Sequence, residues 1–374
     1  MMRRIILNGL VIMMALFSAG CRKTTFIVET DEAYNNLFDR TDGWSGGDVA
    51  CSAPLSDSVI LWLFGDSWIG PVVQNRHYNS QMINNVVAIQ TGIEVRPDRI
   101  KFYYNENEGK ASPLFIPPDG NGWFWLTGGG IMTEKGLALI AGQVAKVEGD
   151  SSVFGFRGVA NYLLLVENPM DDPVNWKVVM KKIPFYEVKP DGTEISFGSL
   201  QLKKNGFIYV YGTELSKPES NRFMLLARTP EDHLSDFDEW EFYGDGAWHR
   251  EFGKSGRLCD LFGAEYSVAW NPSMKKYITI YSEMGMSDKI IMRTSPKPEG
   301  PWSPQEVIYK APESGWDKSY FCYAARGHAE LSGKNDLLIS YICNSTDFWK
   351  MAANADIYRP KFIRIRFGHY HPEK

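Results

Sequence analysis

The feature that most constrains this chain is a β-hairpin pattern that recurs roughly every fifty residues from Asp42 onward. Nearly every segment alternates apolar and polar residues with a period of two, and Gly, Pro, Asn and Asp separate the segments. No window of about a dozen residues keeps a helical spacing. Because period-two alternation is typical of strands with one buried face, the chain after its N-terminal segment is predicted to be nearly all β.

Five hairpins carry this pattern. They turn near Asp57 and at Glu134-Lys135-Gly136, Lys204-Asn205-Gly206, Asn271-Pro272-Ser273 and Gly333-Lys334-Asn335. Three are followed by an apolar strand, a Pro-containing turn and a Trp, so each repeat supplies about four strands. Sheets set radially bury both faces against their neighbours, which explains strands that lose strict alternation. We therefore predict a five-bladed β-propeller with four-stranded antiparallel blades over residues 42–374; a pair of β-sandwiches would need a central linker, and we find none.

The first residues read as a targeting segment. Residues 1–4 are positively charged, residues 5–17 are largely apolar, and small residues precede Cys21. The ending "SAGC" resembles the lipobox of bacterial lipoproteins, which implies a signal peptide over residues 1–20 and acylation of Cys21; an ordinary secretory signal with an incidental Cys is the alternative. We expect residues 21–41 to be a tether, acyl chains to hold the protein to a membrane, and the protein to lie in the cell envelope, either in the periplasm or at the outer-membrane surface.

The amino-acid composition limits the kinds of binding partner that this protein can have. The formal net charge of -5, without a Lys/Arg-rich tract, excludes nucleic acid. The aromatic fraction of 14% suits stacking on sugar rings. The cysteines after Cys21 lack C-x-x-C spacing and a paired His motif, so we expect no zinc site. We also expect no cofactor and a monomer. Cys322 and Cys343 flank a predicted hairpin and could form a disulfide in an exported protein, although small buried hydrophobes are the favoured interpretation.

Two aspartates bracket the first hairpin. A turn centred near Asp57 places Asp48 opposite Asp66, with Cβ atoms about 5 Å apart. Two nearby carboxylates resist ionising together, which raises the pKa of one and leaves a proton donor beside a charged base. Glycoside hydrolysis needs both forms at once. Each aspartate could instead cap a turn through backbone N–H groups.

The starts of the other hairpins carry further polar and aromatic residues. A turn centred near Met274 places Glu265 opposite Glu283. If every first strand faces the propeller axis, these acids meet the residues that open the second and fifth hairpins, which are Trp123, Trp125, Arg326 and His328. These residues also have non-functional interpretations. The acids could lie on the surface by chance, the histidine could be a hydrogen-bonded core residue, and the tryptophans could pack between blades.

The segments "DGWSGGD", "SAPL" and "LWLFGDSWIG", between Asp42 and Gly70, resemble the opening blade of a bacterial family of exported five-bladed propellers, some members of which are endo-D-arabinanases. More broadly, the layout is similar to arabinanase, fructosidase and levansucrase glycoside hydrolases, in which a first-blade Asp and a later Glu act across the funnel. By position, Asp48 and Glu265 match these two acids, and Asp66 lies in the "FGD" of the closer family. The middle-blade Asp of fructosidases has no counterpart, which argues against a fructan substrate.

The resemblance implies a glycoside hydrolase that cleaves a polysaccharide, with an arabinan-type furanoside glycan as one candidate. Asp48 is expected to be the general base or nucleophile and Glu265 the general acid, while Asp66 tunes or shares the acid role. A working pair about 6.5 to 9.5 Å apart across the funnel would invert the anomeric centre, whereas Asp48 and Asp66 at about 5 Å would retain it. The residues expected to bind substrate are Trp44, Trp68, Trp123, Trp125, Glu283, Arg326 and His328.

Two other functions fit the same features. A non-catalytic glycan-binding lipoprotein would use the aromatic funnel without a matched acid pair. A structural or protein-binding role would predict a broad exposed apolar patch on one outer face.

Overall fold

The structure is a computed structural model that describes residues 25–92 and 94–368. The expected signal peptide and Cys21 lie outside the described residues. Strands dominate the described part, which has two short α-helices, α1 (Glu32–Phe38) and α2 (Phe348–Ala352). Within these ranges, no helix combines the length and the apolar character needed to cross a membrane. The 3-10 helices are η1 (Pro97–Arg99), η2 (Pro173–Asn175), η3 (Glu231–His233), η4 (Phe237–Glu239), η5 (Phe252–Lys254), η6 (Pro312–Gly315) and η7 (Ala329–Leu331).

Antiparallel sheets of four to six strands follow one another along the chain. The first sheet contains β3 (Cys51–Ser56), β4 (Val59–Phe64), β9 (Val86–Thr91) and β10 (Ile100–Tyr103). The second contains β14 (Gly130–Thr133), β15 (Gly136–Lys146), β16 (Phe156–Val166) and β17 (Val178–Ile183), with β13 (Trp123–Trp125) on the other half of β15. The third contains β19 (Glu194–Lys204), β20 (Phe207–Ser216), β21 (Asn221–Pro230) and β22 (Glu241–Gly244), extended by β18 (Tyr186–Val188) and β23 (Ala247–His249).

The remaining large sheets complete the series. The fourth contains β24 (Tyr266–Asn271), β25 (Lys276–Ser282), β26 (Lys289–Ser295) and β27 (Glu306–Lys310). The fifth contains β28 (Tyr320–His328), β29 (Asp336–Ser345), β30 (Lys361–Gly368) and β1 (Thr25–Thr30). The smaller sheets are formed by β2 (Trp44–Gly47), β5 (Ser67–Ile69) and β8 (Gln81–Ile83), by β6 (Val72–Val73) and β7 (Arg76–His77), and by β11 (Asn105–Asn107) and β12 (Lys110–Ser112).

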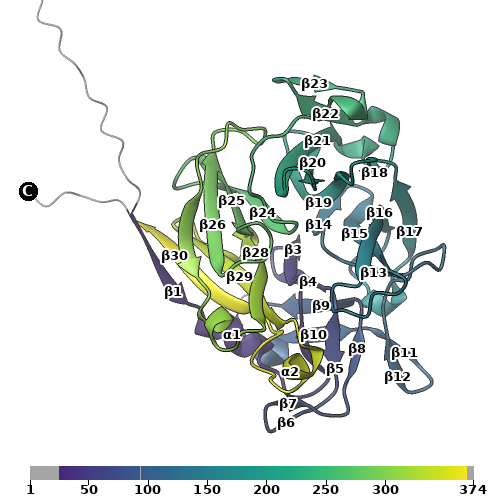
Figure 1. The fold of residues 1–374 in the computed structure, drawn as a ribbon, viewed down its shortest axis with the longest axis vertical. Helices are drawn as coiled ribbons and strands as arrows, with labels where there is room; N and C mark the ends of the chain where they lie inside the picture. The colour runs from purple at the N-terminus through teal and green to yellow at the C-terminus, as the bar shows by residue number, and fades with distance from the viewer. Residues whose placement is uncertain (1–24, 93, 369–374) are drawn as a thin grey trace, which may run out of the picture.

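The first strands of the five large sheets form a closed ring. Strand β3 contacts β14, β14 contacts β19, β19 contacts β24, β24 contacts β28, and β28 returns to β3. Figure 1 shows these strands gathered at the centre, with β17, β23 and β26 toward the periphery. This is a propeller-like arrangement, in which radial repetition leaves few exposed sheet edges.

The apolar core is divided between neighbouring sheets. One cluster joins the first and second sheets, a second joins the second and third, a third joins the third and fourth, and the largest joins the fourth, fifth and first. Strands are therefore buried on both faces; five of the six residues of β4 are buried. This double burial explains why strict alternation fails in the most apolar strands.

The N-terminal strand closes the fifth sheet. Strand β1 pairs with β30 over its whole length, from Thr25 opposite Gly368 to Thr30 opposite Ile363. Helix α1 follows, is capped by Asp31, whose Oδ1 accepts from the Tyr34 amide at 3.2 Å, and buries Leu37 and Phe38. Residues 25–38 were expected to be part of a tether, and this expectation is wrong because their pairing partners lie more than three hundred residues away, where no local pattern can reveal them.

All five predicted hairpins form, and the register of the first is confirmed. Cys51 pairs with Leu63 in β3 and β4, and Gly47 pairs with Ser67 in β2 and β5, as a turn at Asp57 requires. The fourth hairpin differs by one residue, because Tyr266 pairs with Tyr281. Its turn is longer than predicted: β24 ends at Asn271, β25 begins at Lys276, and the Asn271 side chain accepts from the Met274 amide at 2.9 Å.

Candidate active site

Asp48 and Asp66 lie directly opposite each other, as the sequence predicted. The Asp48 amide donates to the Asp66 carbonyl at 3.1 Å, and the Gly65 amide donates to the Asp48 carbonyl at 3.2 Å. Val49 and Ala50 then take φ values of 67° and 47°, which interrupts the extended conformation between β2 and β3. Such irregularities in a strand re-aim side chains and are frequent beside active sites. Here the break directs the Asp48 carboxyl toward neighbouring sheets.

Gly65 allows the close approach of these strands. A Cβ atom at Gly65 would lie 2.4 Å from Asp48 Oδ1 and 2.9 Å from Val49 Cγ2. Neither distance is compatible with real side-chain contacts. The glycine of the "FGD" segment is therefore required because the Asp48 carboxyl occupies the space where a side chain would be.

The Asp48 carboxyl is supported on one oxygen only. Its Oδ2 accepts from Tyr323 Oη at 2.8 Å and from Tyr358 Oη at 3.0 Å. Its Oδ1 is buried and has no hydrogen-bond partner among the described residues. Burial, followed by the charges of Asp66 and Glu265, raises the pKa of Asp48 well above its usual range, and the two tyrosine hydroxyls offset this in part.

The Asp66 carboxyl has different support. Its Oδ1 accepts from Trp125 Nε1 at 2.8 Å and from Asn84 Nδ2 at 3.0 Å. Burial raises the pKa of Asp66, and these two hydrogen bonds favour its charged form. Its environment therefore suits the anion better than that of Asp48, whose pKa the two neighbouring acids raise further.

Glu265 joins this cluster with a cation of its own. Arg326 Nη2 donates to Glu265 Oε2 at 2.8 Å, and the two side chains are 2% and 16% exposed, respectively. Burial raises the pKa of Glu265, while the charge of Arg326 lowers it. Because the charge of Glu265 also acts on Asp48, the three predicted acids form one electrostatic group. The structure thus brings Asp48, Asp66, Glu265 and Arg326 together, as predicted.

Two tyrosines of the cluster were missed by the sequence analysis. Tyr323 precedes an irregularity in β28, where Ala324 has a φ of 53° and the pairing shifts before Arg326. Tyr358 lies between α2 and β30 and is buried. Neither position belongs to a regular period, so only the three-dimensional return of the fifth sheet to the first places these hydroxyls on Asp48.

Of the four tryptophans expected to bind substrate, two lie at the candidate site and two are buried elsewhere. Trp125 lies in the site, where it donates a hydrogen bond to Asp66, and Trp123 packs edge-on against it with ring centres 6.2 Å apart. Trp44 and Trp68 were expected to stack on substrate, but both are buried, at 1% and 4% exposure. Trp44 stacks instead on Phe102, and Trp68 on His77, which leaves neither ring a free face for a sugar.

Glu283 and His328 do not join the acid cluster as expected. The one-residue change of register places Ser282 rather than Glu283 beside the level of Glu265, and Glu283 pairs with Lys289 at 2.8 Å. His328 is buried between the hydroxyls of Ser52 and Ser340. Burial lowers the pKa of His328 to about 3, so this ring is neutral and cannot hold an anion by charge. The alternative interpretation of a hydrogen-bonded core histidine is the one the structure supports.

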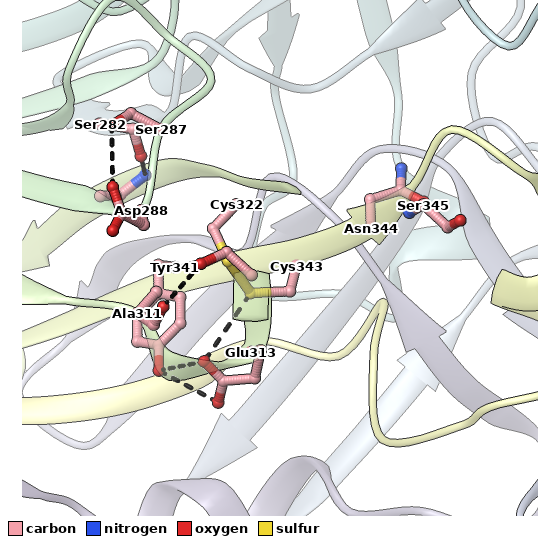
Figure 2. Close-up of a disulfide and its surroundings, with 12 residues drawn as sticks. Ser282, Ser287, Asp288, Ala311, Glu313, Cys322, Tyr341, Cys343, Asn344 and Ser345 are labelled. Carbon is pink, nitrogen blue, oxygen red and sulfur yellow. Dashed lines mark hydrogen bonds between the residues drawn. A yellow bond between two sulfur atoms is a disulfide. The ribbon is translucent and has the colours of Figure 1, made fainter. Parts of the chain in front are cut away.

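Cys322 and Cys343 form a disulfide, in contrast to the interpretation favoured from the sequence (Figure 2). They are directly paired in β28 and β29, with Cα atoms 4.2 Å apart. The buried Glu313 carboxylate lies beside them and accepts from Tyr341 Oη at 3.0 Å. The disulfide joins the two strands next to Tyr323, one of the tyrosines that support Asp48.

The ring of sheets and the carboxyl cluster define an all-β protein of propeller-like fold with an acidic candidate active site. By sequence, the chain belongs to the family described as "Domain of unknown function (DUF5005)", whose model matches residues 31–368. No curated protein matches the sequence.

One of the solved structures that this chain resembles shares its fold. A crystal structure from Bacteroides ovatus ATCC 8483, described as a "putative hydrolase", is 22% identical and has a TM-score of 0.72, with 91% of this chain and 90% of that chain covered. An exo-β-1,3-galactanase from Phanerochaete chrysosporium is 10% identical, with a TM-score of 0.49 and 91% and 64% of the two chains covered. A GH32 β-fructofuranosidase from Bombyx mori is 13% identical, with a TM-score of 0.47 and 88% and 65% covered. This chain spans less than two thirds of the length of those two glycoside hydrolases.

Proposed function

We propose that this protein is a glycoside hydrolase that cleaves a polysaccharide by carboxyl catalysis at the Asp48, Asp66 and Glu265 cluster. The observation that carries the proposal is the opposed pair of Asp48 and Asp66, in which burial raises the pKa of both carboxyls and the charges of Asp66 and Glu265 raise that of Asp48 further. One protonated and one charged carboxyl side by side is the combination that glycoside hydrolysis requires.

The proposed architecture is a five-bladed propeller. The closed ring of five first strands supports it, as does the pairing of β1 with β30. In this arrangement Asp48 and Glu265 precede β3 and β24, the first strands of two different sheets, and Asp66 follows β4 opposite Asp48. The funnel around the axis brings the three acids together.

In the proposed mechanism, Asp48 donates the proton to the leaving oxygen and Asp66 attacks the anomeric carbon. Opposed residues of antiparallel strands have Cβ atoms about 5 Å apart, a spacing that favours retention of configuration. Water then cleaves the glycosyl-Asp66 ester as Asp48 recovers its proton from that water. Asp48 thus takes the acid role expected for Glu265, because the Arg326 guanidinium, 2.8 Å from Glu265, favours the charged form of that carboxyl.

Glu265 serves two purposes in this proposal. Its negative charge raises the pKa of Asp48 and so favours the protonated form of this proton donor. It also stabilises the positive charge that develops on the sugar ring in the oxocarbenium-like transition state.

The proposed setting is the cell envelope, with lipid attached at Cys21. The disulfide between Cys322 and Cys343 supports export, since such bonds persist in oxidising compartments. An arabinan-type furanoside glycan is the first substrate class to test, because the resemblance in the opening hairpin points to it.

The test is product analysis on a panel of polysaccharides that includes D-arabinan, using wild type, Asp48→Asn and Asp66→Asn. Loss of sugar release in both variants, with glycan binding retained, would support the proposal. NMR of the first-formed anomer should show retention. If wild type cleaves no glycan and both variants bind glycans as wild type does, the protein is a glycan-binding lipoprotein instead.

A further inference from the structure

The segment between β15 and β16 reaches from the second sheet to the fifth. Residues 147–155 connect these two strands, and the Phe154 ring contacts the ring of Phe321 in β28, with ring centres 5.8 Å apart. In the ring of first strands, the second and fifth sheets are the two neighbours of the first sheet. The contact therefore bridges the sheets on either side of the hairpin that carries Asp48 and Asp66.

A row of three aromatic rings runs from the Asp48 carboxyl to this segment. Tyr323, which donates its hydroxyl hydrogen bond to Asp48 at 2.8 Å, has its ring centre 5.6 Å from that of Phe321. The Phe154 ring follows at 5.8 Å. Because the ring planes are tilted by 35° and 48°, no ring of the row covers its neighbour face to face. We call Tyr323, Phe321 and Phe154 the aromatic row.

The other end of the segment leads to Asp66. Phe156, the first residue of β16, packs edge-on against Trp125 with ring centres 4.7 Å apart, and Trp125 donates to Asp66 at 2.8 Å. Only Gly155 separates Phe156 from Phe154. The segment is thus connected through aromatic side chains to both carboxyls, and the aromatic row begins where the proposed cleavage takes place.

Hydrogen bonds within the segment fix the position of Phe154. The Val147 amide donates to the Gly155 carbonyl at 2.9 Å, and the Gly155 amide donates to the Ser152 carbonyl at 3.0 Å. The Asp150 carboxylate accepts from the Ser152 amide at 2.9 Å. A Cβ atom at Gly155 would lie 2.5 Å from the Asp150 carbonyl oxygen, so this turn requires glycine. A ring held by an ordered segment loses little conformational entropy when a ligand binds to it.

The outer rings of the row are open to a ligand. Phe154 is 42% exposed, and Phe321 is partly exposed. Exposed aromatic rings offer apolar surface to the C–H faces of sugars. The carboxyl cluster lies directly beyond Tyr323, so an anionic sugar on the row would approach groups of its own charge. The row therefore suits a neutral glycan.

We propose that the aromatic row is a run of subsites for successive units of a neutral glycan. Phe321 contacts the unit next to the one held at the carboxyl pair, and Phe154 contacts the unit after that. The ring spacings of 5.6 and 5.8 Å are comparable with the length of one sugar unit. This inference rests on the proposed function, since it needs a glycan at the carboxyl pair, and it assigns a preference for chains of at least three units.

The test is calorimetric titration of the full chain carrying Asp48→Asn, which prevents turnover, with D-arabino-oligosaccharides and galacto-oligosaccharides of increasing length. Adding Phe154→Ala should weaken binding of trisaccharides and longer chains about tenfold and leave disaccharide binding unchanged. Phe154→Trp, which keeps a ring, should bind all lengths at least as well as the parent. Val153→Ala is the matched control, because Val153 is 38% exposed in the same segment and carries no ring.

Cleavage of the same oligosaccharides separates this proposal from the hydrolase proposal. If wild type cleaves them and Phe154→Ala cleaves every length as Val153→Ala does, the row is not a run of subsites, although the hydrolase proposal stands. If wild type cleaves none of them but Phe154→Ala still shows the length-dependent loss of binding, the hydrolase proposal fails and the row binds glycan without cleavage. The subsites are also overturned if no oligosaccharide binds, or if Phe154→Ala weakens disaccharide binding as much as that of longer chains.

Discussion

Tyr358 donates its hydroxyl hydrogen bond to Asp48 across 310 residues of sequence, at 3.0 Å. Together with Tyr323, it holds one oxygen of a carboxyl that has two acidic neighbours. The protonation state of Asp48 is therefore set jointly by the first and fifth sheets and by the acid of the fourth.

The tyrosine support can be tested through the pH profile. Tyr358→Phe removes a donor that stabilises charged Asp48, so the pKa of Asp48 should rise further. A proton donor with a higher pKa stays protonated to higher pH, so the alkaline limb of the kcat/KM profile should move to higher pH. We also expect kcat/KM to fall about tenfold. Tyr78→Phe, at an exposed tyrosine, is the control. An unshifted alkaline limb in Tyr358→Phe would contradict the assignment of Asp48 as the acid.

Arg326 and Glu265 should be coupled in stability. Arg326→Met leaves the Glu265 carboxylate buried without its cation, which should lower the free energy of unfolding by about 3 to 5 kcal/mol in urea denaturation. Adding Glu265→Gln should recover part of the loss, because the unpaired charge is then removed. Lys289→Met breaks the more exposed pair with Glu283 and should change stability by less than about 1 kcal/mol. Equal losses at both pairs would be evidence against a buried Arg326 to Glu265 interaction.

Gly65 should tolerate no side chain. Gly65→Ala places a methyl group against Asp48 Oδ1, which should destabilise the fold by about 1 to 3 kcal/mol and displace the carboxyl. Gly253→Ala is the control, since a Cβ there meets open space. Thermal unfolding and glycan cleavage measure the two effects. Wild-type behaviour of Gly65→Ala in both assays would mean that the two strands lie further apart than described here.

Glu330 should make stability depend on pH. Burial raises the pKa of Glu330 from 4.5 to about 7. A carboxyl whose folded pKa exceeds its unfolded pKa stabilises the fold at low pH, and this contribution is lost as pH rises from about 4.5 through about 7. Between about pH 5 and 8, wild type should lose at most about 3 kcal/mol relative to Glu330→Gln, and less to the extent that solvent screens the carboxyl.

Urea denaturation of both proteins at the two pH values measures this difference. The neutral, buried His328 has the opposite effect below its ordinary pKa, but it is present in both proteins and cancels. Parallel pH curves for the two proteins would rule out a raised pKa at Glu330.

The disulfide should stabilise the fifth sheet. Cys322 and Cys343 are separated by 21 residues, and closing a loop of that size in the unfolded chain corresponds to about 3 kcal/mol. The double variant Cys322→Ala/Cys343→Ala should lose about that much stability, whereas Cys259→Ala, at a free cysteine, should lose less. Reduction with dithiothreitol should weaken wild type but not the double variant. No difference between reduced and oxidised wild type would show that the bond is not formed in solution.

Local patterns predicted the strands, the turns and the first register, because the two-residue period and the turn residues act over short distances. The pairing predicted for Glu283 was wrong. The turn after Asn271 is longer than the turn residues indicate, and this shifts the strand pairing by one residue. The burial of individual side chains could not be predicted from the sequence either. Trp44 and Trp125 both occur near the start of a hairpin, but Trp44 packs in the core whereas Trp125 donates a hydrogen bond to Asp66. The tyrosines on Asp48 and the pairing of β1 depend on ring closure, which no local period encodes.

The pairing of β1 with β30 has a practical consequence for expressing the protein. A shortened chain that starts at residue 42 would remove β1 and leave the backbone N–H and C=O groups of β30 without partners along one side. Unpaired strand edges template association with other molecules. Such a chain should self-associate edge to edge, whereas a chain that starts before Thr25 keeps this edge covered.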